Sequence, residues 1–226
     1  MSNSDVWVIL PAYNEAETLD LVVGRVRANG YRVVCVDDGS FDATASIARR
    51  LDCDLVVHPF NLGQGAAVQT GIAYALERGA ELICTLDADG QHDPDELPRL
   101  IRALEERRAD FALGSRFLGN AIDMPAFRRA LIMAATIFTR MTTRLTVTDT
   151  HNGMRAMTRR GAALIQLRHD RMAHASEILM QIRRSRLGVV EVPVTVTYTG
   201  YSLRKGQTSW SAFRVLADLA AGLLRS

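Results

Sequence analysis

Residues 82–92 read LICTLDADGQH, and this stretch decides the fold class. A mainly apolar run, Leu82–Leu86, is followed at once by two carboxylates one residue apart, Asp87 and Asp89. A continuous apolar run of this length is typical of a strand buried on both faces, as in a parallel sheet covered by helices. The sequence therefore predicts a buried strand whose carboxyl end carries an acidic loop.

The same strand pattern recurs along the first half of the chain, with helical patterns between the strands. Predicted strands cover residues 6–10, 33–36, 55–57, 82–86 and 111–113; helical patterns cover 19–26, 42–51 with Asp42 as cap, 65–76, and a segment that begins at Asp93-Pro94. This alternation predicts an α/β fold with a doubly wound, mostly parallel sheet flanked by helices. Ligands bind at the carboxyl ends of the strands in such sheets. The polar clusters 11–15, 37–40 and 87–91 all follow strands, so we expect one site at one edge of the sheet.

The pattern changes after residue 120. Residues 124–145 predict a long helix or a helical pair, 149–157 a loop and short strand, 175–186 a helix, 189–198 a strand with Pro193 at an edge or bulge, and 211–224 a terminal amphipathic helix. No repeat or linker divides the chain. We interpret residues 1–226 as one domain with two halves, 1–118 and 119–226.

The composition limits which classes of binding partner are expected. The net charge of +2 does not favour nucleic acid, but arginines gather between residues 116 and 160, which suits an anionic ligand or a membrane surface. The three cysteines are interpreted as reduced, buried thiols. Because we see neither a signal peptide nor an apolar run of ~20 residues, we expect a cytoplasmic protein. Residues 124–145 mix apolar residues with four arginines, which suits either an interfacial helix at the cytoplasmic face of the membrane or a core helix whose arginines extend to water. The sequence does not indicate an oligomeric state.

The acidic loop suits a hard divalent cation. Asp87 and Asp89 could both reach one ion, and Gln91 adds an amide oxygen nearby. Mg²⁺ and Mn²⁺ favour such oxygen ligands and commonly share their coordination shell with substrate phosphates. The sequence therefore predicts a Mg²⁺ or Mn²⁺ site that takes a phosphate-bearing ligand.

The other two clusters offer groups for a nucleoside. One of Asp37 and Asp38 could accept hydrogen bonds from a base or ribose, while the other caps the turn at Ser40. Tyr13 offers a stacking face, and Glu15 could bond a base edge or only favour a helix N-terminus. The turn 61–65, NLGQG, could present backbone amides to phosphate, but it is not a dinucleotide-binding G-x-G-x-x-G.

Together these motifs resemble family 2 glycosyltransferases of the GT-A fold, and within them the dolichyl- and polyprenyl-phosphate sugar synthases. The segments that carry the resemblance are VILPAYNE (8–15), VDDGSFD (36–42), NLG (61–63), DADGQH (87–92) and GSRF (114–117). Weaker matches continue at 128–129, 149–155 and 191–193, and the stretch 198–207 keeps a Ser and a Lys of a related motif at altered spacing.

The resemblance implies a role for each matching residue. Residues 1–118 become the nucleotide-sugar-binding half, with Pro11, Tyr13, Glu15, Asp37, Asp38, Gln64 and Asp87 toward the donor. The residues implied to bind the metal and the diphosphate are Asp87, Asp89 and Gln91. Residues 119–226 become the acceptor-side half. The residues implied to bind the acceptor or its phosphate are Arg116, Arg129, Arg155, Ser202 and Lys205. Asp89 and Arg116 are the residues implied to be catalytic, together with Glu177 in the alternative given next.

The implied reaction moves a sugar, with inversion at the anomeric carbon, from a UDP- or GDP-sugar to an acceptor that we expect to be polyprenyl phosphate. Two alternatives stay open: a saccharide hydroxyl acceptor with Glu177 as general base, and a protein that binds a nucleotide-sugar without turnover. A haloacid-dehalogenase-like phosphatase also uses Asp-x-Asp-Gly after a buried strand. Its threonine is replaced here by Gln91, and no later acidic pair follows a strand.

Overall fold

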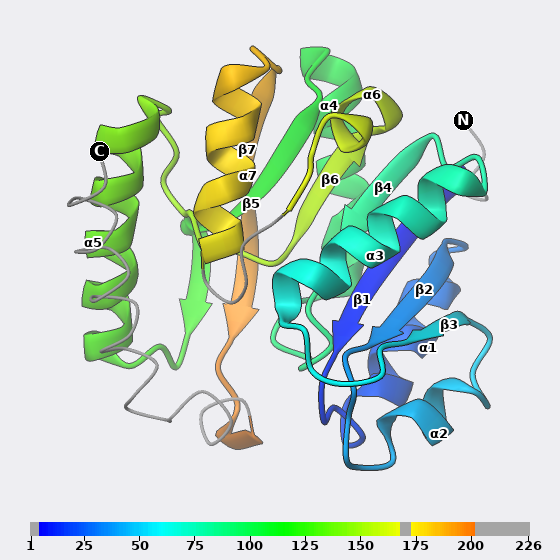
Figure 1. The fold of residues 1–226 in the computed structure, drawn as a ribbon. Coiled ribbons are helices and arrows are strands. Elements are labelled where there is room, and N and C mark those ends of the chain that lie inside the picture. The colour runs from blue at the N-terminus through cyan, green and yellow to red at the C-terminus, as the bar shows by residue number, and fades with distance from the viewer. Residues whose placement is uncertain (1–4, 168–172, 202–226) are drawn as a thin grey trace.

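The apolar runs of the sequence become the strands of a seven-stranded sheet with order β3-β2-β1-β4-β6-β5-β7. The computed structural model describes residues 5–167 and 173–201 (Figure 1). The strands are β1 (Val6–Ala12), β2 (Arg32–Asp37), β3 (Asp54–Val57), β4 (Leu82–Thr85), β5 (Phe111–Ile122), β6 (Arg155–Thr158) and β7 (Val189–Thr197). The helices are α1 (Leu19–Ala28), α2 (Thr44–Ala48), α3 (Gln64–Glu77), the 3-10 turn η2 (Pro94–Glu96), α4 (Leu97–Arg107), α5 (Ala126–Thr143), α6 (Arg159–Ala163) and α7 (Ala173–Arg184).

The sheet is mixed but mostly parallel, which confirms the predicted fold class. β1 pairs in parallel with β2 and β4, β2 with β3, and β5 with β7. β6 is antiparallel to both of its neighbours, β4 and β5. Because β6 comes later in the chain than either neighbour, the two halves of the sequence share one sheet.

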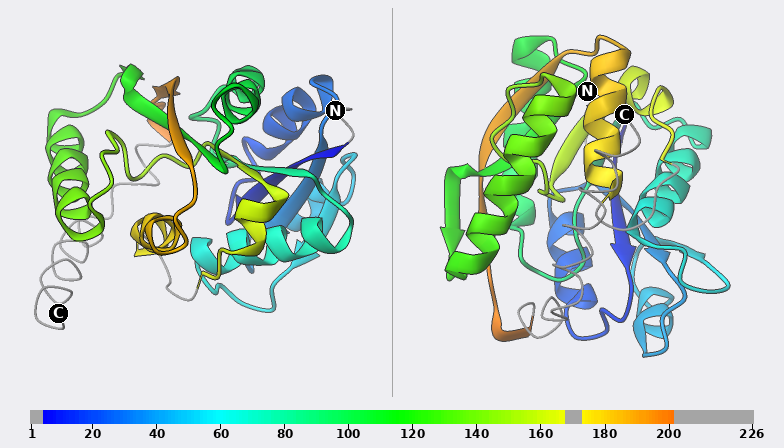
Figure 2. Two further views of the ribbon diagram at one scale, coloured as in Figure 1. Left: turned by 90° about the horizontal axis from the view of Figure 1, so that it is seen from above. Right: turned by 60° about the vertical axis from the view of Figure 1, so that its left-hand side comes forward.

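Helices cover both faces of the sheet, which explains why the strand sequences are continuously apolar. Val8 and Leu10 of β1 pack with α1 and α4, while Trp7 and Ile9 pack with α3 on the opposite face. The view from above separates α1 and α4 from α3 and α7 across the sheet (Figure 2). All four of these β1 side chains are at most 2% exposed.

Most predicted elements lie close to their expected bounds. Residues 124–145 contain a single helix, α5, and Pro193 lies in β7 at the edge of the sheet. The predicted helix from Asp42 to Leu51 was too long, because α2 spans only Thr44–Ala48 and its N-cap is Ala43. Asp42 instead accepts a hydrogen bond from the Thr44 amide, 2.9 Å away. The predicted helix 211–224 lies outside the described residues.

Among the described residues, no helix combines the length and apolarity needed to cross a bilayer.

Candidate active site

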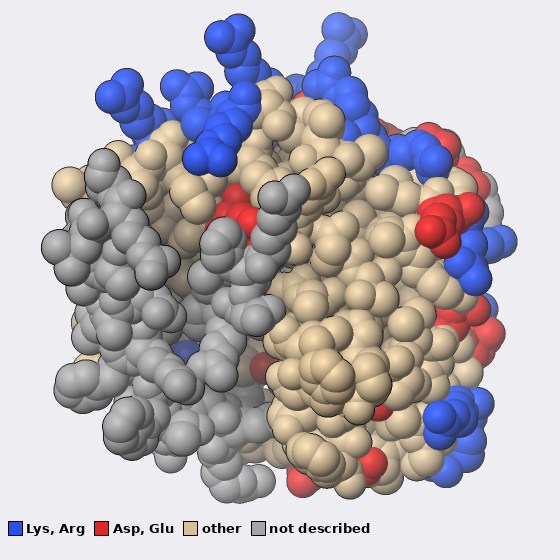
Figure 3. Space-filling model, viewed as in Figure 1, with Lys and Arg blue, Asp and Glu red and all other residues tan. Residues whose placement is uncertain are grey.

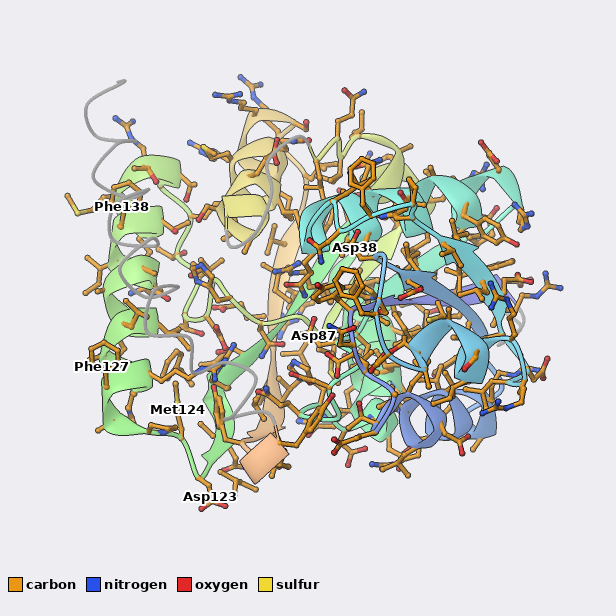
Figure 4. All side chains as sticks on the ribbon, turned by 60° about the horizontal axis from the view of Figure 1, so that its bottom comes forward. Asp38, Asp87, Asp123, Met124, Phe127 and Phe138 are labelled. Carbon is orange, nitrogen blue, oxygen red and sulfur yellow. The ribbon has the colours of Figure 1, made fainter. Side chains whose placement is uncertain are left out.

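The three predicted polar clusters meet at one edge of the sheet, because β1 lies between β2 and β4 and all three strands are parallel. Hydrogen bonds join the clusters directly. The Asn14 amide donates to Ser40 Oγ at 2.9 Å, and the Thr18 hydroxyl donates to the Ala88 carbonyl at 2.7 Å. Asp38 and Asp87 lie at this same edge in Figure 4. The geometry therefore confirms one composite site rather than three separate loops.

Asp37 and Asp38, at the end of β2, accept hydrogen bonds from different parts of the chain. Asp37 holds its own turn through Oδ1, which accepts hydrogen bonds from the Ser40 amide and hydroxyl. Asp38 is 3% exposed, and both of its carboxylate oxygens accept backbone amides of the NLG turn: Leu62 at 2.9 Å and Gly63 at 2.8 Å. Asp38 thus ties the end of β2 to the start of α3.

The loop after β1 presents an aromatic side chain and a nearly buried carboxylate. Tyr13, half-buried, meets the exposed ring of Phe41 edge-on, with centroids 6.3 Å apart. Glu15 is 8% exposed, and its Oε2 accepts a hydrogen bond from the Tyr201 hydroxyl at 2.9 Å. Burial and the Glu15 carboxylate together raise the pKa of Tyr201. Pro11, partly exposed, lies beside Val36 of β2.

Each carboxylate of the Asp-Ala-Asp loop is held by a glutamine. Gln64 Nε2 donates to Asp87 Oδ1 at 2.7 Å, and Gln91 Nε2 donates to Asp89 Oδ2 at 2.7 Å. Both aspartates are partly exposed, so a ligand can reach them. His92 Nε2 lies 3.7 Å from Asp87 Oδ2, and the histidine side chain is 3% exposed. Its Nδ1 is the one buried side-chain nitrogen or oxygen without a hydrogen-bond partner among the described residues.

The donor set fits a Mg²⁺ or Mn²⁺ ion that is completed by substrate. No group of three or more His, Cys, Asp or Glu residues within 5–167 and 173–201 could hold a metal alone. Two carboxylates and an amide oxygen, with the remaining positions left to phosphate and water, match the way proteins bind Mg²⁺ in phosphate chemistry. The backbone of Gly153 leaves room for Asp87, since a Cβ there would lie 2.1 Å from Oδ2.

Arg116 was predicted to contact the acceptor, but the structure places it in a buried internal network. Its Nε donates to Asp149 Oδ2 at 2.6 Å, Nη1 to the Tyr198 hydroxyl at 2.5 Å and Nη2 to the His151 carbonyl at 2.7 Å. Burial acts to lower the pKa of Arg116, but Asp149 and Tyr198 outweigh it and the pKa is raised. Arg116 therefore fixes the 149–152 loop beside the site.

Arg155 begins β6 directly behind the acidic loop and is 5% exposed. Burial lowers the pKa of its guanidinium, and the carboxylates of Asp87 and Asp149 oppose that effect. This cation offsets part of the negative charge at Asp87.

Arg128 and Arg129 stand at the start of α5, on the far side of the site from β2. The Arg128 guanidinium lies 5.0 Å from the Tyr198 ring centroid, and that of Arg129 lies 6.0 Å from the Phe117 ring centroid. Within the described part of the chain, neither guanidinium is paired with a carboxylate.

Arg159 and Arg160, at the end of the 116–160 stretch, are not part of this site. Arg159 donates to the Ala80 and Leu76 carbonyls, and Arg160 pairs with Asp110 at the opposite end of the strands. Figure 3 shows cationic side chains gathered along the upper edge, away from the carboxyl ends of β1 and β2. The cluster in the sequence is therefore divided in space.

Glu177, the candidate general base, lies in α7 and is 5% exposed. Gln181 Nε2 donates to its Oε1 at 3.4 Å. Ser202 and Lys205 lie outside the described residues.

Several residues of the site were not predicted from the sequence. Asp149, Tyr198 and Tyr201 serve the site through partners far away in the chain, and His58 bonds Asp38 from behind at 2.7 Å. Gly153, although inside a quoted motif, gave no sign that it faces Asp87. Four of these residues lie in the weakly matching stretches 149–155 and 198–207, but the sequence assigned them no role, and His58 lies outside every matching segment.

The family is settled by comparison with known proteins. The model for "Glycosyl transferase family 2" matches residues 7–163 of this chain. The chain belongs to glycosyltransferase family 2. Its matched region includes the loops after β1, β2 and β4, and the enzyme class is therefore a glycosyltransferase.

Two relatives are similar to this family 2 glycosyltransferase over most of its length. It is 36% identical over 202 residues to the undecaprenyl-phosphate mannosyltransferase of Micrococcus luteus, covering 84% of this chain and 82% of that protein. It is 29% identical over 241 residues to a UDP-N-acetylglucosamine–dolichyl-phosphate N-acetylglucosaminyltransferase of Methanococcus voltae, covering 97% and 96%.

The fold of this family 2 glycosyltransferase also has a solved counterpart. Glucosyl-3-phosphoglycerate synthase from Mycobacterium tuberculosis, in complex with Mn²⁺ and UDP-glucose, superposes with a TM-score of 0.69 at 18% identity, covering 96% of this chain and 78% of that one. At this identity the likeness shows the shared GT-A-like fold.

Proposed function

We propose that this chain transfers a sugar, with inversion, from a nucleoside-diphosphate-sugar to a polyprenyl phosphate. The observation that carries the proposal is the pairing of an acidic donor edge with an apolar, arginine-bearing helix, α5, at the side of the molecule. The names of the relatives, which act on undecaprenyl and dolichyl phosphate, support the same acceptor class.

The donor would lie across the carboxyl ends of β1, β2 and β4. Tyr13 offers a ring face to the base, and Asp37, which is 1% exposed and bonds Ser40 through Oδ1, would hold the turn that meets the nucleoside. Asp87, Asp89 and Gln91 would hold Mg²⁺ or Mn²⁺ together with the diphosphate. When bound, the ion neutralises charge that develops on the leaving diphosphate.

The acceptor phosphate would meet the arginines at the start of α5. Arg129 is exposed, Arg128 is half-buried, and within the described residues no carboxylate neutralises them. A guanidinium group can donate two hydrogen bonds to two oxygens of one phosphate. Arg128 and Arg129 therefore form a suitable binding site for a phosphate headgroup. We assign Arg116 to positioning, since its three side-chain nitrogens are already bonded. Arg155, behind Asp87, would balance charge at the diphosphate.

Helix α5 has the unusual feature that four of its larger apolar side chains face outward. Its buried face consists of Ile132, Ala135, Thr136, Thr139 and Thr143. Its outward side carries Phe127, Met133, Ile137 and Met141, which are 48% to 76% exposed. Phe127 and Phe138 lie along the outer edge of the molecule in Figure 4.

This helix therefore resembles an interfacial helix rather than a core helix whose arginines extend to water. Residues 126–144 hold four arginines and no Asp or Glu. An apolar stripe flanked by cations suits the surface of a bilayer with anionic headgroups. A second copy of the chain would instead bring like charges together. We propose peripheral membrane contact through α5, which would bring a lipid-linked phosphate to the site.

A phosphate acceptor also explains how the site could work without a strong base. Polyprenyl phosphate is already anionic at neutral pH, so one of its oxygens can attack the anomeric carbon as the bond to the diphosphate breaks. Arg128 and Arg129 would orient that oxygen, and the buried pair Arg116–Asp149 would keep the neighbouring loop in place. A hydroxyl acceptor would require a general base within hydrogen-bond reach.

The test is a panel of UDP- and GDP-sugars with Mn²⁺ or Mg²⁺, offered with a short polyprenyl phosphate or with saccharide acceptors. We expect one donor to give a polyprenyl-phosphate sugar of inverted anomeric configuration, read by NMR. Transfer to saccharide hydroxyls alone would refute the phosphate acceptor. Donor binding without turnover on either acceptor would support the non-catalytic alternative.

A further inference from the structure

A buried histidine behind the donor loops makes contacts that the proposed function does not use. His58 follows β3 and is 7% exposed. Its Nδ1 lies 2.7 Å from Asp38 Oδ1, and its Nε2 lies 3.0 Å from the hydroxyl of Thr70 on α3. An ionised carboxylate only accepts hydrogen bonds, so Nδ1 donates to Asp38. Both ring nitrogens are thus engaged, and the ring orientation is fixed.

The carboxylate that His58 holds serves as a cap for α3. The N-cap residue of α3 is Gly63, which has no side chain to cap the first turn. Asp38 supplies the missing acceptor from another part of the chain, since its oxygens bond the Leu62 and Gly63 amides. A carboxylate at a helix N-terminus is favoured by the exposed amides and the helix dipole.

The start of α3 in turn touches the metal loop. Gln64, the first residue of α3, donates to Asp87 Oδ1 at 2.7 Å. A continuous set of contacts therefore runs from Thr70 through His58 and Asp38 to the start of α3, and then from Gln64 to Asp87.

We propose that His58 is a positioning residue for donor binding. By fixing Asp38 it fixes the start of α3, and so holds Gln64 against Asp87. The inference rests on the proposed function, because it requires the donor diphosphate and its metal to bind at Asp87. It assigns a role to a residue outside the motifs that carry the family resemblance.

The experiment measures the Kd for UDP and GDP in the presence of Mn²⁺ by calorimetry. His58→Leu fills the space without hydrogen bonds, and we expect Kd to rise about tenfold, as for loss of a charge-assisted hydrogen bond. His58→Asn keeps a donor near the place of Nδ1 and should bind within about threefold of the wild type. In a Gln64→Ala background, His58→Leu should change Kd by less than about twofold, because the two residues act in series.

A control separates positioning from general loss of stability. Val23→Ala removes buried volume from α1, on the other face of the sheet, and should lower Tm while leaving Kd unchanged. His58→Leu with wild-type Kd, or with an undiminished effect in the Gln64→Ala background, would overturn the inference and leave the proposed function standing. Failure of the wild-type protein to bind either nucleotide would overturn both.

Discussion

Replacing Gly153 with alanine should displace a metal-site carboxylate without disturbing the fold. The new Cβ would lie 2.1 Å from Asp87 Oδ2 and 2.4 Å from its Cγ, whereas real Cβ contacts stay above 3.0 Å. The φ of Gly153 lies outside the left-handed region, so alanine adds no backbone strain. The backbone cannot easily retreat, because the Gly153 carbonyl accepts a hydrogen bond from the Thr85 hydroxyl at 2.7 Å.

Asp87 must therefore move, and the required shift sets the expected loss. A misplacement of about 1 Å in a site can cost ~10²-fold in rate. We expect kcat/KM to fall about 100-fold, equivalent to ~2.7 kcal/mol of transition-state stabilisation. Because Asp87 is partly exposed and can turn toward water, the unfolding free energy should change by less than about 1 kcal/mol.

The assay pairs steady-state transfer kinetics with thermal melting, and α1 provides a matched control. Gly24 has no atom within 4 Å of an added Cβ, so Gly24→Ala should leave turnover unchanged and stabilise the helix by about 1 kcal/mol. If Gly153→Ala kept wild-type kcat/KM and metal dependence, the reasoning that places Asp87 at the reacting diphosphate would be refuted.

Three other predictions use the same assays. Asp89→Ala should abolish Mn²⁺-dependent nucleotide binding in a protein that still melts cooperatively; undiminished binding would contradict a metal role for Asp89. Arg129→Ala should weaken use of polyprenyl phosphate severely while Glu177→Gln remains mild; a loss of ~10²-fold in the glutamine variant alone would favour a hydroxyl acceptor. Burial raises the pKa of the Cys84 thiol to about 12 from its ordinary 9.0, so the thiolate forms more readily in the unfolded chain. The stability contributed by Cys84 should be complete below pH 9 and be lost as pH rises toward 12, which a pH series of denaturant melts would detect; alkylation of Cys84 in the folded protein at pH 8 would disagree.

The donor half of the site was predictable because its residues directly follow their strands. Apolar runs identify strands locally, and parallel strands bring their carboxyl ends to one edge whatever the details of packing. The positions of Tyr13, Asp37 and Asp87 follow from that rule alone. Their roles toward a donor remain predictions, since geometry places a residue without showing what it binds.

The acceptor side was less predictable because its contacts join distant parts of the chain. Arg116 was expected to meet a ligand, but its partners Asp149 and Tyr198 are 33 and 82 residues away. The helical pattern of α5 could not reveal which face is buried, because threonines fill the inner face where larger apolar residues are usual. Tertiary packing decided both cases, and the local sequence did not show which distant residues meet or which face of α5 is covered.

The place of β6 in the sheet limits how this enzyme can be re-engineered. Exchanging everything after residue 118 with a relative would look like a natural way to transplant acceptor preference. However, β6 lies between β4 and β5, so such a chimera would insert a foreign strand into the middle of the native sheet. A chain cut at residue 118 would leave the inner edges of β4 and β5 unpaired, and unpaired edges promote aggregation. A workable graft has to retain residues 155–158 with the native first half and exchange only the surrounding loops and helices.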